Sequence, residues 1–286
     1  MSLRTVIFVD GQNFKRNLQE FSYRSNNLNA RYPEYRLDEK HFDWTEFFLG
    51  VVEKFNQATH LDHILIRAYW YTAETITPFP QARDQWIQDI IAANSDDFPE
   101  LTPEYIQNLA RVWWERERDF FQITRSQVFE SIQRRTDFLE FQYTGQYVVR
   151  PFDVYRIYRD YSSNEIIYQG RRVGEKGVDV GIAVDMISKL SNYDAGILIS
   201  GDADYIPAVL YIKNQLKNFY QFSLAKGIPP QIHHLSPWLR GVVDSFQSFN
   251  ELEFIEQYLV RSSGIPSYIL DSIDSRLLEL RKMSQS

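Results

Sequence analysis

Short runs of consecutive apolar residues alternate along this chain with longer stretches in which apolar residues recur every three or four positions. Residues 4–9, 63–71 and 195–199 are largely apolar runs with the length and β-branched character of buried strands. Residues 42–55 and 179–190 have the spacing of helices. Because strands that alternate with helices form parallel sheets covered by helices, the pattern predicts an α/β fold with a largely parallel sheet.

The segment 76–140 has a different texture. Prolines punctuate it, and amphipathic helical stripes lie between them. We therefore expect a helical insertion in a domain formed by residues 1–75 and 141–256, followed by a C-terminal helical tail at 257–286. Such an insertion suits a lid, a substrate-selecting surface, or a contact with a protein partner or a second copy of the chain.

Residues 141–174 return to the texture of strands. Asp153–Tyr158 and Glu165–Tyr168 flank Ser162-Ser163-Asn164, which is a turn sequence. The sequence therefore predicts a β-hairpin ahead of the Gly174-Glu175-Lys176-Gly177 stretch.

Composition narrows the class of protein. With 286 residues, of which 44% are hydrophobic and 24% charged, the chain is long and apolar enough for a sizeable core. The absence of cysteine excludes disulfide scaffolds, thiolate zinc sites and cysteine nucleophiles. The apolar run near the start, Thr5–Val9, is too short for a secretory signal or a membrane span, so we expect a cytoplasmic protein with no membrane partner.

Net charge limits the partners that the whole chain attracts. It amounts to −7, from 31 Lys and Arg against 38 Asp and Glu, so long-range attraction does not draw the chain to nucleic acid. Binding of nucleic acid has to rest on a local basic patch or on cations that neutralise an acidic one. Aromatic residues reach 15%, which serves either a large core or base stacking.

Four aspartates stand where predicted strands end or a helix begins. Asp10 ends the first strand, Asp202 and Asp204 follow the strand at 195–199, and Asp179 opens a helix. In open α/β sheets the functional crevice lies at the carboxyl ends of the strands. Four carboxylates in one crevice repel one another unless a cation binds or one takes up a proton, and oxygen ligands suit Mg²⁺ or Mn²⁺. Each aspartate taken alone is more often a helix cap or a turn residue.

Three further side chains are candidates for a role near these acids. Asp185 lies about 120° from Asp179 around a helix, so we interpret it as a partner of a ligand or as a buried salt-bridge acid. His233 and His234 are adjacent, and adjacent side chains point apart on both strands and helices. We therefore expect loop or core histidines there rather than a metal site.

Three sequence segments follow one another along the chain. They are Val6–Asn13 with the ending Val-Asp-Gly-Gln-Asn, Glu175–Met186 with Lys-Gly-Val-Asp-Val, and Ile197–Pro207 with Ser-Gly-Asp-Ala-Asp-Tyr. Together they resemble the NYN domain family, of the LabA-like type, within the PIN-like nuclease superfamily. The third segment, which is followed by an apolar helix, is the most specific. Residues 76–140 match no part of the family and depart from its compact form.

The resemblance implies a largely parallel sheet sandwiched by helices, with an acidic metal site that hydrolyses RNA phosphodiester bonds. By the same resemblance we expect a single-stranded or structured RNA as substrate and Mg²⁺ or Mn²⁺ as cofactor. Asn13 resembles the amide that orients Asp10 or contacts the substrate, and Ser200 resembles a residue that shapes the site. Carried over by position, the catalytic and metal-binding residues are Asp10, Asp179, Asp202 and Asp204.

Basic side chains near the second segment offer contacts to phosphates. We single out Lys176 and Arg172 as candidate substrate-binding residues, with Lys176 foremost, and Arg171 and Lys189 lie nearby. Solvated surface charge is the alternative interpretation of each.

Other functions fit parts of the sequence. A non-catalytic NYN-fold adaptor that binds RNA or protein through the insertion agrees with the acidic net charge, although Asp10, Asp179 and Asp202 are all kept. DNA cleavage by the same metal chemistry is open, because a preference for the 2′-hydroxyl cannot be read from the sequence. A phosphatase of the haloacid dehalogenase kind is excluded, because it needs a second Asp where Gln12 stands.

Overall fold

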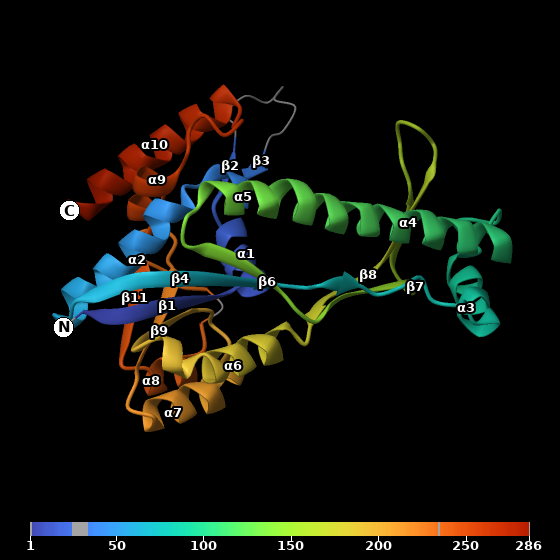
Figure 1. Ribbon diagram of the computed structural model, residues 1–286. Coiled ribbons are helices and arrows are strands. Elements are labelled where there is room, and N and C mark those ends of the chain that lie inside the picture. Colours follow the sequence, from blue (N-terminus) through green and yellow to red (C-terminus); the bar gives the residue numbers. More distant parts are fainter. Residues whose placement is uncertain (1, 25–33, 234, 286) are drawn as a thin grey trace. The chain divides into compact units, whose positions relative to one another are not determined.

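The chain divides into two compact units in a computed structural model that describes residues 2–24, 34–233 and 235–285 (Figure 1). The first, which we call the sheet unit, comprises Met1–Thr72, Val128–Tyr143 and Val178–Ser286. The second, which we call the hairpin unit, comprises Ala73–Gln127 and Thr144–Gly177.

A six-stranded parallel sheet forms the centre of the sheet unit. Its strand order is β11-β10-β9-β1-β4-β6, and every neighbouring pair runs in the same direction. The predicted α/β fold with a parallel sheet is thus confirmed. The strands are β1 (Leu3–Asp10), β4 (His63–Thr72), β6 (Leu139–Tyr143), β9 (Ala195–Ile199), β10 (Asn218–Leu224) and β11 (Ser245–Phe249).

Helices cover both faces of this sheet, which is why its central strands are apolar runs rather than alternating ones. Figure 1 shows α2 (Trp44–Thr59) on one side, and α6 (Val178–Ser188) with α7 (Ile206–Asn214) on the other. Ile7 of β1 belongs to one core with the aromatic residues of α2, whereas the Phe8 ring packs edge-on against Tyr193. Successive β1 side chains therefore enter opposite cores.

Shorter elements complete the sheet unit. Antiparallel β2 and β3 form a separate two-stranded sheet. None of the helices in the described ranges combines the length and hydropathy needed to cross a lipid bilayer. The remaining elements are α1 (Gly11–Gln19), β2 (Ser22–Arg24), β3 (Glu34–Arg36), α5 (Glu130–Arg135), α8 (Pro237–Val242), α9 (Glu251–Tyr258) and α10 (Ser267–Ser284).

The hairpin unit has an apolar core of its own. Antiparallel β7 (Gln146–Arg159) and β8 (Ile166–Lys176) form the predicted hairpin, and β5 (Thr75–Ile76) pairs with β7. Side chains of α3 (Asp84–Asn94) and α4 (Pro103–Ile123) pack on this sheet. A π-helix, Thr124–Phe129, follows α4 along the chain. The division of the chain into the domains expected from the sequence stays a prediction.

Candidate functional site

The carboxyl ends of β1 and β9 lie side by side and bring Asp10 and Ser200 together. Asp10 is the last residue of β1 and also the N-cap of α1, where its side chain accepts a hydrogen bond from the Asn13 backbone N–H at 3.0 Å. Ser200 follows β9, and its Oγ donates to Asp10 Oδ2 at 2.9 Å. Parallel pairing of the two strands places these ends at one edge, as the sequence pattern predicts.

Gly11 makes the turn at this edge possible. A Cβ at this position would clash with the Tyr71 carbonyl oxygen and lie 2.6 Å from Trp70 Nε1. A side chain there would push α1 off the neighbouring strand, so only glycine lets the helix begin directly at the end of β1.

Asp10 is a buried carboxyl group held by three donors. Only 4% of the residue is exposed. Its pKa is raised to about 6: burial is the main cause and the nearby Asp179 charge adds to it, while hydrogen bonds from Asn13, Ser200 and Tyr205 lower the pKa. The edge of the sheet therefore holds a carboxyl group that binds a proton far more readily than an exposed aspartate.

Tyr205 joins Asp10 to Asp179. Its hydroxyl lies 3.2 Å from Asp10 Oδ2 and 3.0 Å from Asp179 Oδ1, and its ring is fully buried. Burial, with the two carboxylates in support, raises the pKa of Tyr205 far above its usual range, so the phenol keeps its proton. The single hydroxyl hydrogen of Tyr205 can be donated to only one carboxylate at a time. Either Asp10 or Asp179 is therefore left without a hydrogen bond from Tyr205.

Tyr205 lies within the third sequence segment, but the sequence pattern assigns it no role. Asp179 lies in the first turn of α6, so its meeting with Asp10 is a tertiary contact across the sheet edge. The signal available in the sequence is the position of Tyr205. It is an aromatic residue with a polar hydroxyl group that comes directly after two acids near the end of a strand.

The carboxylates of Asp202 and Asp204 do not take part in the hydrogen bonds of the Tyr205 hydroxyl. Asp202 caps the 3₁₀ turn Ala203–Tyr205 by accepting from the Asp204 N–H at 3.0 Å, and its own N–H donates to Ser200 Oγ at 3.1 Å. Asp204 is exposed, and within the described ranges its carboxylate makes no hydrogen bond or ion pair. The site therefore links Asp10, Asp179 and Asp202 through Tyr205 and Ser200, with Asp204 at its border.

The side-chain amide of Asn13 does not hold Asp10 in the way expected of an orienting amide. Its backbone N–H, not its amide, holds Asp10. Its Oδ1 accepts from the Gly201 N–H at 3.1 Å and from Asn17 Nδ2 at 3.3 Å. Because Oδ1 is bound by two donors, the amide orientation is set and its NH₂ group faces away from them. Asn13 and Asp202 line an open pocket of about 540 Å³.

The basic candidates belong to the hairpin unit. Arg172 on β8 makes a bidentate ion pair with the largely buried Glu117 of α4, with Nε–Oε2 and Nη2–Oε1 distances of 2.7 and 2.5 Å. This contact satisfies the guanidinium within its own unit and raises the pKa of Arg172. Lys176 is exposed at the end of β8. A role of either cation in holding phosphates stays a prediction.

Asp185 serves a separate pair of contacts. It accepts a 2.9 Å hydrogen bond from the Tyr71 hydroxyl and forms an ion pair with Lys189 at 2.6 Å. Lys189 also lies 5.0 Å from the centre of the Tyr69 ring. Asp185 is thus a half-buried salt-bridge acid, one of the two interpretations that the helical spacing allowed.

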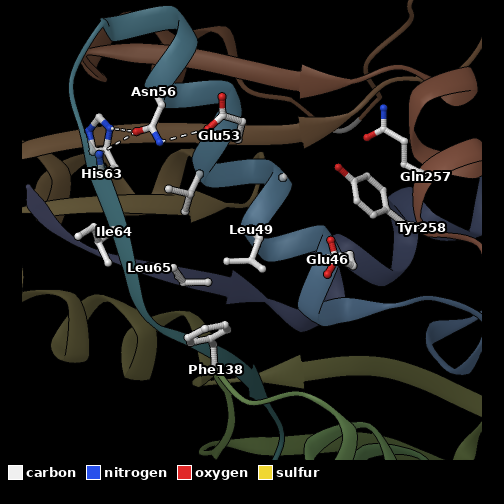
Figure 2. A pocket seen from close by; sticks show the side chains of 12 residues that line it. Glu46, Leu49, Glu53, Asn56, His63, Ile64, Leu65, Phe138, Gln257 and Tyr258 are labelled. Atoms are coloured by element: carbon white, nitrogen blue, oxygen red, sulfur yellow. Dashed lines mark hydrogen bonds between the residues drawn. The ribbon is translucent and has the colours of Figure 1, made fainter.

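A larger groove in the sheet unit lies at the opposite end of the strands. It measures about 810 Å³ and lies between α2 and the first half of β4 (Figure 2). His63 sits there with its ring bound to Asn56 Oδ1 and the Tyr220 hydroxyl, and burial lowers its pKa. His63 begins β4 whereas Asp10 ends β1, so this groove is not part of the acidic edge.

A hard divalent cation fits the donors at the acidic edge. The oxygens of Asp10 and Asp179 are of the type that Mg²⁺ and Mn²⁺ prefer, and a cation would offset the negative charge of the two carboxylates. Among the described residues, no three His, Asp or Glu side chains are arranged around one metal position. Mg²⁺ commonly uses only one or two carboxylates and completes its shell with water and substrate phosphate.

Comparisons with known proteins bear on the family. No curated protein matches the chain. A crystal structure of a protein of unknown function from Vibrio parahaemolyticus is 18% identical, covers 87% of this chain and 94% of its own, and has a TM-score of 0.40. The model of the NYN domain family matches residues 117–248.

The matched segment contains Asp179, Asp202, Asp204 and Tyr205, and the parallel sheet adds Asp10 from outside it. The LabA-like type stays a prediction. The match confirms the resemblance seen in the sequence: residues 117–248 of this chain match the NYN domain family.

Proposed function

We propose that this protein is a metal-dependent endoribonuclease that hydrolyses RNA phosphodiester bonds at the edge of the sheet where Asp10 and Asp179 meet. The observation that carries the proposal is the convergence of these two carboxylates on the Tyr205 hydroxyl, at 3.2 and 3.0 Å. An NYN domain is generally nuclease-like, and a carboxylate edge at the strand ends suits hydrolysis with Mg²⁺ or Mn²⁺.

Asp10 and Asp179 would hold the cation, with Asp202 and Asp204 as further acids at the border. When bound, Mg²⁺ or Mn²⁺ supplies Lewis-acid polarisation of the phosphate and lowers the pKa of water. The protein side chains do the positioning. Ser200 and Tyr205 fix the Asp10 carboxyl group, and the amide NH₂ of Asn13 is a donor for a phosphate or base oxygen.

A non-catalytic RNA- or protein-binding adaptor is the second candidate. It is favoured by the absence, in the described parts of the chain, of three acidic or histidine ligands around one position. It is also favoured by the capping roles of Asp10 and Asp202, which give these acids a structural use.

Cleavage assays separate the two candidates. End-labelled single-stranded and hairpin RNA would be incubated with Mg²⁺, with Mn²⁺ and with EDTA, using the wild-type chain and the Asp10→Asn and Asp179→Asn variants. Nuclease action predicts metal-dependent cutting that falls by roughly 100-fold or more in both variants.

Asp43→Asn is the matched control for Asp10→Asn. Asp43 is also a helix N-cap, at the start of α2, and asparagine caps a helix about as well as aspartate. Cutting that survives in Asp43→Asn but not in Asp10→Asn assigns the loss to the site rather than to capping. No cutting by the wild-type chain, or equal cutting by all variants, would leave the adaptor.

A further inference from the structure

The pocket beside Asp202 is built from two parts of the sheet unit. The strand-end turns form one wall, and the segment ahead of α8 forms the other. The Ser236 N–H donates to the Gly201 carbonyl at 2.8 Å and ties the two walls together. The lining residues are Asn13, Gly201, Asp202, Ala203, Ile232, His233, Leu235 and Ser236; His234 lies outside the described residues.

The chemistry of this lining suits a flat ring with a polar edge. Ile232 and Leu235 are half-buried and offer apolar walls, and the His233 imidazole is exposed. The Asn13 NH₂ has no hydrogen-bond partner within the described ranges, although its Oδ1 has two. A volume of about 540 Å³ lies within the roughly 300–1,000 Å³ of small-molecule sites.

An exposed indole stands next to this pocket in the chain. Trp238 is the second residue of α8, two positions after Ser236, and 76% of it is exposed. A tryptophan bound to the core of its own chain would bury most of its ring, because burial of such a large apolar surface is favourable. An exposed indole is a typical platform for base stacking.

We propose that this pocket binds an unpaired nucleobase of the RNA next to the acidic edge, and that Trp238 stacks on it. The inference rests on the proposed function and deepens it. Single-stranded RNA is then the substrate class, because bases within an A-form duplex are stacked and paired and present no free ring to a pocket.

Contacts connect the pocket directly to the acidic edge. Asn13 lines the pocket and holds Asp10 with its backbone N–H. Asp202 lines it too, and its N–H is bound to Ser200 Oγ, which donates to Asp10. The groove in Figure 2 is larger, but it lies at the amino end of β4 and has no such connection within the described ranges.

The test is an equilibrium binding experiment that does not depend on cleavage. The parent chain carries Asp10→Asn, so that RNA stays intact, and Mg²⁺ is present. Fluorescence anisotropy measures binding to a fluorescein-labelled 12-nucleotide adenosine strand and to the same strand paired with uridines. Trp238→Ala, Trp238→Phe, His233→Ala and the control Tyr211→Ala, another exposed aromatic residue of the sheet unit, are compared in this background.

The proposal predicts a Kd for the single strand that rises about tenfold in Trp238→Ala and rises in His233→Ala. Trp238→Phe should lose less affinity than Trp238→Ala, because phenylalanine keeps a smaller stacking face. Tyr211→Ala should stay near the parent value, because Tyr211 does not line the pocket. The duplex should bind more weakly than the single strand, with no dependence on Trp238.

Equal affinities of the parent, Trp238→Ala and His233→Ala for the single strand would overturn the inference. Tighter binding of the duplex, or no binding of the single strand, would overturn it as well. The nuclease proposal is decided separately, by cleavage with the intact Asp10, so the failure of one is distinguishable from the failure of the other.

Discussion

Tyr205 Oη lies 3.0 Å from Oδ1 of Asp179, although the two residues come from different elements on either side of β9. The same hydroxyl reaches Asp10, so a single buried phenol sets the spacing of two carboxylates. Tyr205 is thus a positioning residue of the proposed site. It acts through the acids rather than on the RNA.

Replacing Tyr205 by Phe tests this role. The ring still fills its buried position, but the shared donor is lost and the two carboxylates face each other with no hydrogen between them. We expect a loss of about 1 kcal/mol in the free energy of unfolding and a fall in cleavage rate of roughly 10- to 100-fold. Isothermal titration with Mn²⁺ should show weaker binding; unchanged Mn²⁺ affinity would reduce Tyr205 to a packing residue.

The buried Asp10 carboxyl group makes stability depend on pH in a defined direction. Its pKa in the folded chain is about 6, against an ordinary value of 3.8, so between these values the folded state binds the extra proton. This contribution to stability is fully present below about pH 4, is lost as the pH rises through 6, and amounts to about 3 kcal/mol at most.

Asp10→Asn removes this titration. In EDTA, the variant should gain stability relative to the wild type as the pH rises from 4 to 7, with the change completed just above 6. Urea unfolding followed at several pH values measures it. A difference between the two chains that does not vary with pH would contradict the assignment to Asp10.

Divalent cations should stabilise the folded chain. A cation that binds the Asp10–Asp179 pair adds free energy of about 2.7 kcal/mol when its concentration is 100 times its Kd. We expect the unfolding temperature to rise with Mn²⁺ over EDTA and the rise to disappear in Asp179→Asn. Asp43→Asn should keep the rise, and a rise of the same size in Asp179→Asn would place the cation elsewhere.

Variants of the Arg172–Glu117 ion pair distinguish a structural role of Arg172 from a role in binding phosphate. Glu117 is largely buried and Arg172 is exposed, so Arg172→Ala leaves a buried carboxylate without its partner and should cost about 1–2 kcal/mol of stability. If the arginine serves only this pair, cleavage per folded molecule is unchanged.

Glu117→Gln completes this test by releasing the guanidinium. A phosphate-binding Arg172 should retain activity in Glu117→Gln and lose it in Arg172→Ala. Equal activity of both variants, with unfolding measured alongside to count folded molecules, would restrict Arg172 to the structure of the hairpin unit.

The sequence by itself determined the parallel sheet and one edge of the site. Strands buried on both faces have to be apolar throughout, so β1 and β9 are visible as short runs that end in polar residues. Parallel strands bring their carboxyl ends to one edge, and this predicts that the acids that follow β1 and β9, Asp10 and Asp202, lie at the same edge. The β7–β8 hairpin was likewise readable from its turn.

Only the tertiary structure decided what each side chain does at that edge. Tyr205 links Asp10 to Asp179, Asn13 turns its amide to Gly201, and Arg172 binds Glu117. These contacts join residues that are distant in sequence, and local spacing carries no information about such partners. Burial decided the rest, because the pKa of Asp10 depends on the atoms packed around it rather than on its neighbours in the chain.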